Sequence, residues 1–168
     1  MAIWKHILEY DNGVTNFHFE ITADLLDEEE LELISRMRPG LIQLEIGVQS
    51  TNTETIRAIR RKMDLKRLRY VVERINAGKN VHQHLDLIAG LPFEDYESFG
   101  RSFNEVYSME PEQFQLGFLK VLKGSYMHDM VEEYGLKYRG KAPYEVLSTK
   151  WLPYSDVLRL KGVEDMVE

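Results

Sequence analysis

Cysteine is absent from this chain of 168 residues. That absence excludes disulfides, zinc sites with thiolate ligands, and iron–sulfur clusters held by the chain's own thiolates. Long hydrophobic runs are also missing, since none approaches the roughly 20 residues that a membrane-spanning helix needs. The first residues, Met1 to Lys5, lack the basic segment followed by an apolar segment that marks a secretory signal. We therefore expect a cytoplasmic protein with no membrane partner.

An excess of positive charge is also absent. The chain has 21 Lys and Arg against 28 Asp and Glu, which gives a formal net charge of −7. A broad electrostatic surface for nucleic acid is therefore not expected, although a local basic patch is compatible with this balance. Hydrophobic residues make up 43% and charged residues 29%, an ordinary mixture for a soluble globular domain. The length fits one domain with a real hydrophobic core.

Four segments have the polar and apolar alternation or the β-prone composition of strands. They are residues 16–21, 41–49, 81–88 and 113–122. Helical patterns separate them at residues 24–38, 53–77 with a break near Asp64, and 95–109. Connections of this length that contain a helix predict parallel neighbouring strands with right-handed crossovers. The chain is therefore predicted to be an α/β protein.

Three of the four strands combine an apolar face with a polar face. Strands of an open parallel sheet are usually apolar on both faces, because helices cover both. A barrel has helices only on its outside, and its lumen can be polar where it holds a ligand. The polar stripes are Asn16, His18 and Glu20; Gln43, Glu45 and Gln49; and His82, His84 and Asp86. We predict a partial (half) TIM-like barrel of about four parallel strands with outer helices.

The C-terminal tail is less regular than the rest. A short helix is expected at residues 126–134, a loop at 137–143 and a terminal helix at 154–167. We therefore divide the chain into a barrel segment, residues 1–124, and an irregular helical extension, residues 125–168, that packs on the barrel segment.

Candidate binding residues lie where strands end. Glu20 could bind an ammonium or a ribose hydroxyl, although a solvated strand-end charge is the simpler interpretation. Gln49 and Ser50 end the second strand, where a turn with a helix cap explains them equally well. A guanidinium near a barrel mouth suits a carboxylate ligand, but a solvated helix face is the usual reason for such charges. The basic cluster in question is Arg57, Arg60, Arg61 and Lys62.

The stripe of His82, His84 and Asp86 leaves a metal site open. Two histidines two residues apart on a barrel strand begin the metal site of some hydrolases. This alternative, a metal-dependent barrel hydrolase, is weakened because His82 lies toward the N-terminal end of its strand. A third interpretation is a non-catalytic binding or assembly module.

Four segments resemble, in order, the second half of a radical S-adenosylmethionine (SAM) barrel. They are residues 17–34, 41–62, 84–99 and 118–127, and the resemblance spans residues 15–127. The segments are similar to oxygen-independent coproporphyrinogen oxidases and radical SAM methylthiotransferases. Residues 142–147 further resemble a branch whose members tend to carry an N-terminal cobalamin-binding-type domain, which makes cobalamin a possible further cofactor.

The resemblance implies roles for the charged and polar candidates. Glu20 would contact the SAM amino group, and Arg61 would pair with the SAM carboxylate. Gln49, with Ser50 nearby, would hold the ribose.

It also implies how the third strand and its exit serve the cofactor. Asp86 would reach the sugar or a polar group of the substrate. Ile88 and the backbone of Gly90 and Leu91 would line the adenine. Phe93 stands where the family often has glycine.

The family's C-x-x-x-C-x-x-C loop, which holds a 4Fe–4S cluster, is missing. We therefore expect the chain to be a fragment of a radical SAM enzyme that lacks its N-terminal half and is inactive alone. Its parent would cleave SAM reductively to a 5′-deoxyadenosyl radical that acts on a substrate the sequence does not reveal. The exposed edge strand near Asn16 is expected to pair with another copy or to be covered by the tail.

Overall fold

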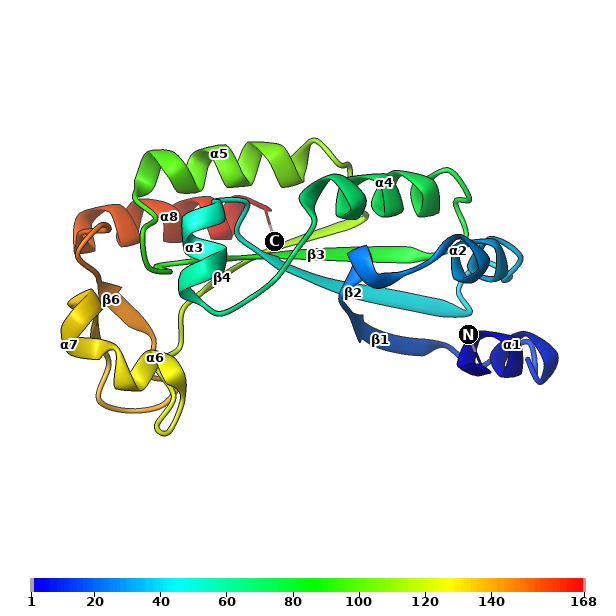
Figure 1. The fold of residues 1–168 in the computed structure, drawn as a ribbon, viewed down its shortest axis with the longest axis horizontal. Coiled ribbons are helices and arrows are strands. Elements are labelled where there is room, and N and C mark those ends of the chain that lie inside the picture. Colours follow the sequence, from blue (N-terminus) through cyan, green and yellow to red (C-terminus); the bar gives the residue numbers. More distant parts are fainter. Residues whose placement is uncertain (1, 168) are drawn as a thin grey trace. The chain divides into compact units, whose positions relative to one another are not determined.

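A four-stranded sheet forms the framework of the computed structural model, which describes residues 2–167 (Figure 1). Its strands follow the chain in the order β1 (Phe17–Ile21), β2 (Ile42–Gln49), β3 (His82–Ala89) and β4 (Gln113–Phe118). β1 and β2 pair in parallel, with Phe17 opposite Ile42. Each strand lies beside its successor, as strands do in a barrel. The predicted half-barrel is thus confirmed, as a sheet that does not close.

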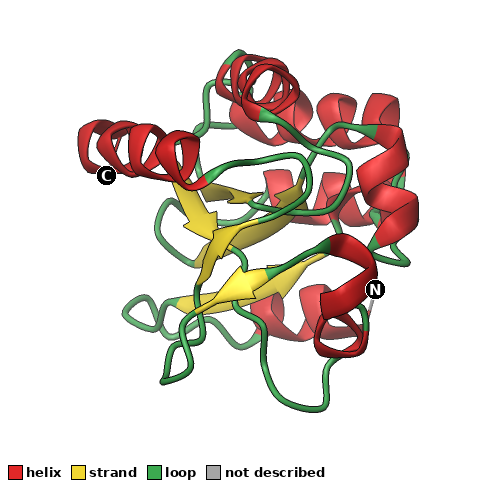
Figure 2. Ribbon diagram, turned by 90° about the vertical axis from the view of Figure 1, so that its left-hand side faces the viewer, coloured by secondary structure: helices red, strands yellow, loops and turns green. Residues whose placement is uncertain are grey.

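Helices precede β1, connect the four strands and recur in the tail (Figure 2). They are α1 (Ala2–Glu9), a short 3-10 helix η1 (Ala23–Leu25), α2 (Glu28–Ser35), α3 (Thr53–Ala58), α4 (Leu65–Asn76), α5 (Tyr96–Tyr107), α6 (Tyr126–Asp129), α7 (Val131–Tyr134) and α8 (Tyr154–Val167). Within residues 2–167, no helix has the length and apolar character to cross a membrane.

The chain divides into two compact units. Unit 1 comprises Met1–Gly47, Met63–Leu85 and Val106–Phe114. Unit 2 comprises Val48–Lys62, Asp86–Glu105 and Gln115–Glu168. The first parts of β2, β3 and β4 therefore belong to unit 1, and their ends belong to unit 2.

Unit 1 is built on the apolar faces of the first strands. Ile42, Leu44 and Ile46 of β2 are fully buried, while Gln43 and Glu45 between them are only half-buried. Helix α1 packs beside α2, and α2 beside α4 (Figure 1). This alternation agrees with the prediction of one apolar and one polar face for β2.

The predicted break near Asp64 is confirmed, and its cause is a helix cap. The Asp64 carboxylate accepts hydrogen bonds from the backbone N–H groups of Lys66 and Arg67, both at 3.0 Å. A side chain in this position satisfies the donors at the start of a helix, so α4 begins directly after Asp64.

Unit 2 contains the tail, which differs from the sequence prediction in two respects. The single helix expected at residues 126–134 is two short helices, α6 and α7. Residues 137–143, predicted to be a loop, include the strand β5 (Lys137–Tyr138), which pairs antiparallel with β6 (Val146–Ser148). Strands this short show too little alternation to be recognised in a sequence. β4 is also shorter than the predicted 113–122, because the chain after Phe118 turns to pair with residues 144–146 of the tail.

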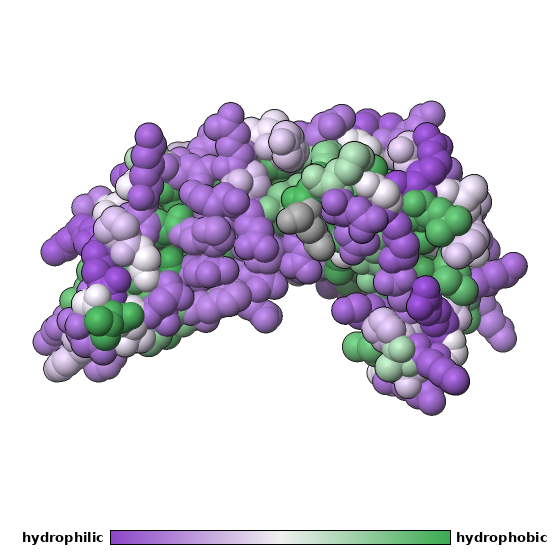
Figure 3. Space-filling view, turned by 180° about the vertical axis from the view of Figure 1, so that it is seen from behind, coloured by the Kyte–Doolittle hydropathy of each residue, from purple (hydrophilic) through white to green (hydrophobic). Residues whose placement is uncertain are grey.

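The tail buries an apolar cluster in unit 2. Its buried members are Leu91, Leu119, Val121, Tyr134, Leu136 and Val146. The helix α8 packs beside β6. Hydrophilic residues cover most of the face shown in Figure 3, with hydrophobic patches between them.

Candidate functional site

The end of β2 carries the first candidate residues, and the chain turns sharply there. Gln49 has a φ of 70°, a left-handed conformation that non-glycine residues rarely adopt. This turn directs the next residue, Ser50, into the interior, where its side chain is completely buried. Ser50 was predicted to lie near the ribose of SAM, and that role stays a prediction. The structure shows that the hydroxyl of Ser50 donates a hydrogen bond to a carboxyl group within unit 2.

That carboxyl group belongs to Glu94, which sequence reasoning left without a role. Glu94 is 1% exposed, and its Oε1 accepts hydrogen bonds from Ser50 Oγ at 2.7 Å and from Ser102 Oγ at 3.0 Å. Burial raises the pKa of Glu94 to about 7, although the two serine hydroxyls oppose that shift. The sequence around Glu94 does not reveal that its carboxyl group is buried and hydrogen-bonded, because the two serine partners lie 44 and 8 residues away along the chain.

Two further hydrogen bonds join the same turns. Asn52 Nδ2 donates to the carbonyl oxygen of Phe93 at 2.9 Å, and Thr55 Oγ1 donates to that of Pro92 at 2.8 Å. The turn after β2 is therefore fastened to the turn after β3 at several points. The residues predicted to bind the ribose, Gln49 and Ser50, lie in or next to these turns. So do those predicted to line the adenine, Ile88, Gly90 and Leu91.

The exit of β3 depends on a glycine. Gly90 has a φ of +86°, and a Cβ built on it would lie 2.6 Å from Val146 Cγ1. Leu91 is buried in the tail's apolar cluster, and Ile88 packs against that cluster. Ile88 and Leu91 thus offer an apolar surface, but the structure also assigns both to the packing of the tail.

The side chain of Phe93 packs the turn after β3 against aromatic residues of the tail. Phe93 has a φ of 62°, in the left-handed region that favours glycine. Its ring centroid lies 4.5 Å from that of Trp151 and 5.9 Å from that of Tyr134. The backbone conformation explains why glycine suits this position, and the ring contacts explain what phenylalanine adds.

The basic cluster follows helix α3. Arg60 has a φ of 57°, and the N–H of Arg61 donates to the carbonyl of Ile56 at 3.0 Å, which closes the helix in a Schellman motif. The Arg60 guanidinium lies 3.7 Å from the centre of the Tyr126 ring. Arg61 is half-buried while Arg57 is exposed, so the two arginines differ in environment. The predicted contact of Arg61 with a carboxylate ligand is untested by this geometry.

Glu20, in unit 1, is exposed at the end of β1. On the same strand, His18 Nε2 lies 3.0 Å from Glu45 Oε2 of β2. The polar face predicted for β1 therefore exists. The contact of Glu20 with the amino group of SAM stays a prediction from the resemblance.

The two histidines of β3 differ in their exposure to solvent. His82 is exposed, whereas His84 is 7% exposed. Asp86 is half-buried. Among the residues that the structure describes, no group of three His, Asp or Glu side chains is arranged to hold a metal ion. The geometry therefore gives the hydrolase alternative no support.

Comparison with known proteins agrees with the barrel interpretation. A family model described as "Protein of unknown function (DUF4080)" matches residues 132–168. The oxygen-independent coproporphyrinogen III oxidase of Salmonella typhimurium is 29% identical over 110 residues, covering 60% of this chain and 23% of that protein. The enzyme of the same name from Pseudomonas aeruginosa is 27% identical over 111 residues, covering 66% and 23%. The chain thus spans about a quarter of the length of these relatives.

Two solved structures share its fold over nearly the whole chain. Coproporphyrinogen III oxidase from Escherichia coli, described as a radical SAM enzyme, has a TM-score of 0.67 at 18% identity, covering 96% of this chain and 35% of that one. The radical SAM methyltransferase TsrM from Kitasatospora setae, solved with cobalamin and a [4Fe-4S] cluster bound, has a TM-score of 0.71 at 12% identity, covering 95% and 40%. The chain therefore has the fold of part of a radical SAM barrel. The resemblance to oxygen-independent coproporphyrinogen oxidases seen in its sequence is confirmed.

Proposed function

We propose that this chain is the SAM-binding part of a radical SAM enzyme whose cluster-binding cysteines lie outside these 168 residues. The observation that carries the proposal is the fold, which matches radical SAM enzymes over 95–96% of the chain. The sequence relationship to coproporphyrinogen oxidases supports the same reaction class. We keep the cytoplasm as the expected compartment.

The chemistry of the donor set fits SAM but not the cluster. In unit 2, Gln49 can hydrogen-bond a ribose, the Arg61 guanidinium can pair with a carboxylate, and Ile88 offers an apolar surface for adenine. Glu20 would serve the amino group, as the resemblance implies. A 4Fe–4S cluster requires thiolates, and the chain has no cysteine. With both groups bound, reductive cleavage of SAM would supply a carbon radical for hydrogen abstraction.

The partner that we propose is a cysteine-bearing strand–helix segment that adds to the free edge of β1. β1 is the first strand in the sheet order, and the N–H of its Phe17 donates to the carbonyl oxygen of Leu41, the residue before β2, at 2.8 Å. Residues of a parallel strand direct their backbone groups to alternate sides. The backbone groups of His18 and Glu20 therefore face away from β2, where a further strand could pair with them.

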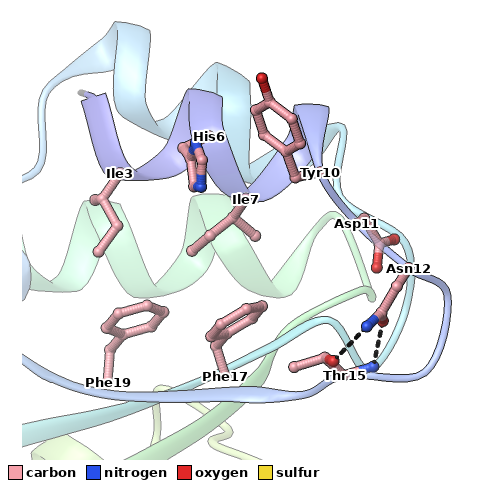
Figure 4. Close-up of a pocket in the computed structure, with 9 residues that line it drawn as sticks. All are labelled: Ile3, His6, Ile7, Tyr10, Asp11, Asn12, Thr15, Phe17 and Phe19. Atoms are coloured by element: carbon pink, nitrogen blue, oxygen red, sulfur yellow. Dashed lines mark hydrogen bonds between the residues drawn. The ribbon is translucent and has the colours of Figure 1, made fainter.

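A groove beside this edge has the character that such a strand requires. It has a volume of about 390 Å³ and lies between helix α1 and strand β1 (Figure 4). Ile3 and Ile7 of α1 point down toward Phe17 and Phe19 of β1 (Figure 4). Phe17 is 37% exposed and Ile3 is 50% exposed. Apolar side chains on one face of an added strand would cover this surface, which is otherwise a liability at a sheet edge.

The proposal is tested on the native polypeptide that contains this chain, isolated without oxygen. We expect about four iron atoms per polypeptide and formation of 5′-deoxyadenosine from SAM when a reductant is added. Arg61→Ala should weaken SAM binding at least about tenfold, the loss of a charge-assisted pair. Arg57→Ala, which removes an exposed arginine of the same basic cluster, is the matched control and should leave SAM binding unchanged. A polypeptide without iron that binds no SAM would contradict the proposal.

A further inference from the structure

The carboxyl group of Glu94 joins three segments of unit 2. Ser50 lies in the turn after β2, Glu94 in the turn after β3, and Ser102 on helix α5. Thr51 adds its backbone N–H and its hydroxyl as donors to Ser102 Oγ, both at 3.2 Å. The N–H of Asn52 donates to Ser50 Oγ at 3.0 Å. We call these two turns and their shared network the Glu94 clamp, comprising residues 49–55, 90–94 and Ser102.

The second oxygen of Glu94 makes the clamp sensitive to charge. Within residues 2–167, Glu94 Oε2 is buried and has no hydrogen-bond partner. A buried oxygen without a partner is costly, and much more so when it carries part of a negative charge. The neutral acid therefore suits the closed clamp better than the carboxylate does. A water molecule at Oε2 would lower the energetic cost of the ionised carboxylate, and the two turns must separate to admit it.

The charged groups around Glu94 do not override this effect. Asp95, the next residue, disfavours the carboxylate, whereas Arg101 of α5 favours it. The segment Ser50–Thr53 across the clamp contributes only hydroxyl and amide side chains. Burial is the largest influence, and it raises the pKa of Glu94 to about 7.

The clamp matters for function because of what its turns carry. Gln49 and Ser50 begin the first turn, and Gly90 and Leu91 begin the second. These are the residues expected to meet the ribose and the adenine of SAM. A change in the clamp therefore changes the geometry of both sets at once.

We propose that Glu94 is a positioning residue of the SAM site: in its neutral form it holds the two cofactor-binding turns together, and its ionisation loosens them and weakens SAM binding. This proposal rests on the proposed function for the identity of the ligand. The clamp itself is a property of this chain and can be followed without SAM.

Trp151 reports on the clamp directly, because its ring contacts Phe93, the neighbour of Glu94. The other tryptophan, Trp4, is replaced in a Trp4→Phe background so that emission comes from Trp151 alone. We expect Trp151 fluorescence to change with pH in one step with a midpoint of about 7. Glu94→Gln, which keeps an acceptor oxygen but cannot ionise, should remove the step. Glu97→Gln, at an exposed glutamate on α5, is the control and should retain it. A step that persists in Glu94→Gln, or its absence in the parent, overturns the proposal.

SAM titrations of the native polypeptide provide the second readout. In the polypeptide with Glu94 intact, SAM affinity should fall several-fold as pH rises through the fluorescence step. In the Glu94→Gln variant, SAM affinity should not change across that range. Glu94→Ala, which removes the acceptor, should bind weakly at every pH, and Glu94→Gln should rescue it. SAM binding that is pH-independent in the parent overturns the proposal and leaves the proposed function standing. A fluorescence step with no SAM binding at any pH contradicts the proposed function while the clamp survives.

Discussion

Single residues at the strand ends of unit 2 hold unusual conformations or charges. Gly90 is the clearest example, because its backbone lies in the left-handed region and Val146 occupies the space where a side chain would stand. Gly90→Ala combines left-handed strain with overpacking, so we expect a loss of about 2–4 kcal/mol of stability. Urea unfolding of the purified chain measures this loss.

Gly100→Ala is the matched control for that substitution. Gly100 lies inside helix α5, its φ is not in the left-handed region, and nothing lies within 4 Å of a Cβ built on it. Alanine is the better helix former, so Gly100→Ala should stabilise the chain by about 0.5–1 kcal/mol. If both substitutions shift the urea midpoint in the same direction, the assignment of Gly90 as a required glycine is wrong.

The raised pKa of Glu94 predicts a pH dependence of stability with a definite sign. The carboxyl has an ordinary pKa of 4.5 when unfolded and a pKa of about 7 when folded. The folded state therefore binds the proton more tightly, and this contribution to stability is complete below pH 4.5 and is lost as pH rises toward 7. We expect the parent to lose roughly 3 kcal/mol relative to Glu94→Gln over this range. Urea unfolding at a series of pH values gives the difference, and equal slopes for the two proteins would refute it.

At the scale of elements, helix caps determine where the chain changes direction. Asp64 caps α4 through two backbone N–H groups, both at 3.0 Å. Asp64→Ala should therefore cost about 1 kcal/mol, whereas Asp64→Asn should cost only a few tenths, because asparagine retains the acceptor. Thermal unfolding followed by circular dichroism distinguishes the two variants, and an equal loss in both would show that the cap is not the cause.

The turn after β3 is coupled to the tail through Phe93. Its ring contacts Trp151 and Tyr134, and its backbone is left-handed. Both Phe93→Ala and Phe93→Gly lose the ring contacts, but only alanine keeps the backbone strain. We expect Phe93→Gly to be more stable than Phe93→Ala by about 0.5–1 kcal/mol, the reverse of the usual order.

Denaturant unfolding of the two Phe93 variants provides the measurement. The same pair of substitutions at exposed Glu97 of α5 should show the usual order, with glycine about 1 kcal/mol worse than alanine. An ordinary order at Phe93 would mean that its backbone strain does not contribute to stability.

These elements also show how far the sequence could predict the structure. The strands, the break at Asp64 and the terminal helix follow from local patterns and caps, and the structure has them. The pairing of β5 with β6 was missed because two or three residues carry no periodicity. The Glu94 clamp was missed for a different reason: a serine, a glutamate and another serine become a network only when the fold brings together residues 50, 94 and 102.

At the scale of the whole molecule, the free edge of β1 and the missing thiolates point to the same requirement. We propose that a further strand covers the edge, and the proposed chemistry needs a cluster that these residues cannot hold. One cysteine-bearing segment would satisfy both. We therefore expect the 168-residue chain alone to contain no iron–sulfur cluster after reconstitution with iron and sulfide, which absorption spectroscopy would show.

Sequencing of the native transcript upstream of the codon for Met1 tests the central claim most directly. Our account predicts an open reading frame that continues upstream and encodes further strand–helix units with a C-x-x-x-C-x-x-C segment. The groove beside α1 and β1 would then have its occupant within the same polypeptide. A transcript in which translation begins at Met1, with no cysteine-bearing segment joined to it, would contradict the assignment of this chain to a radical SAM enzyme.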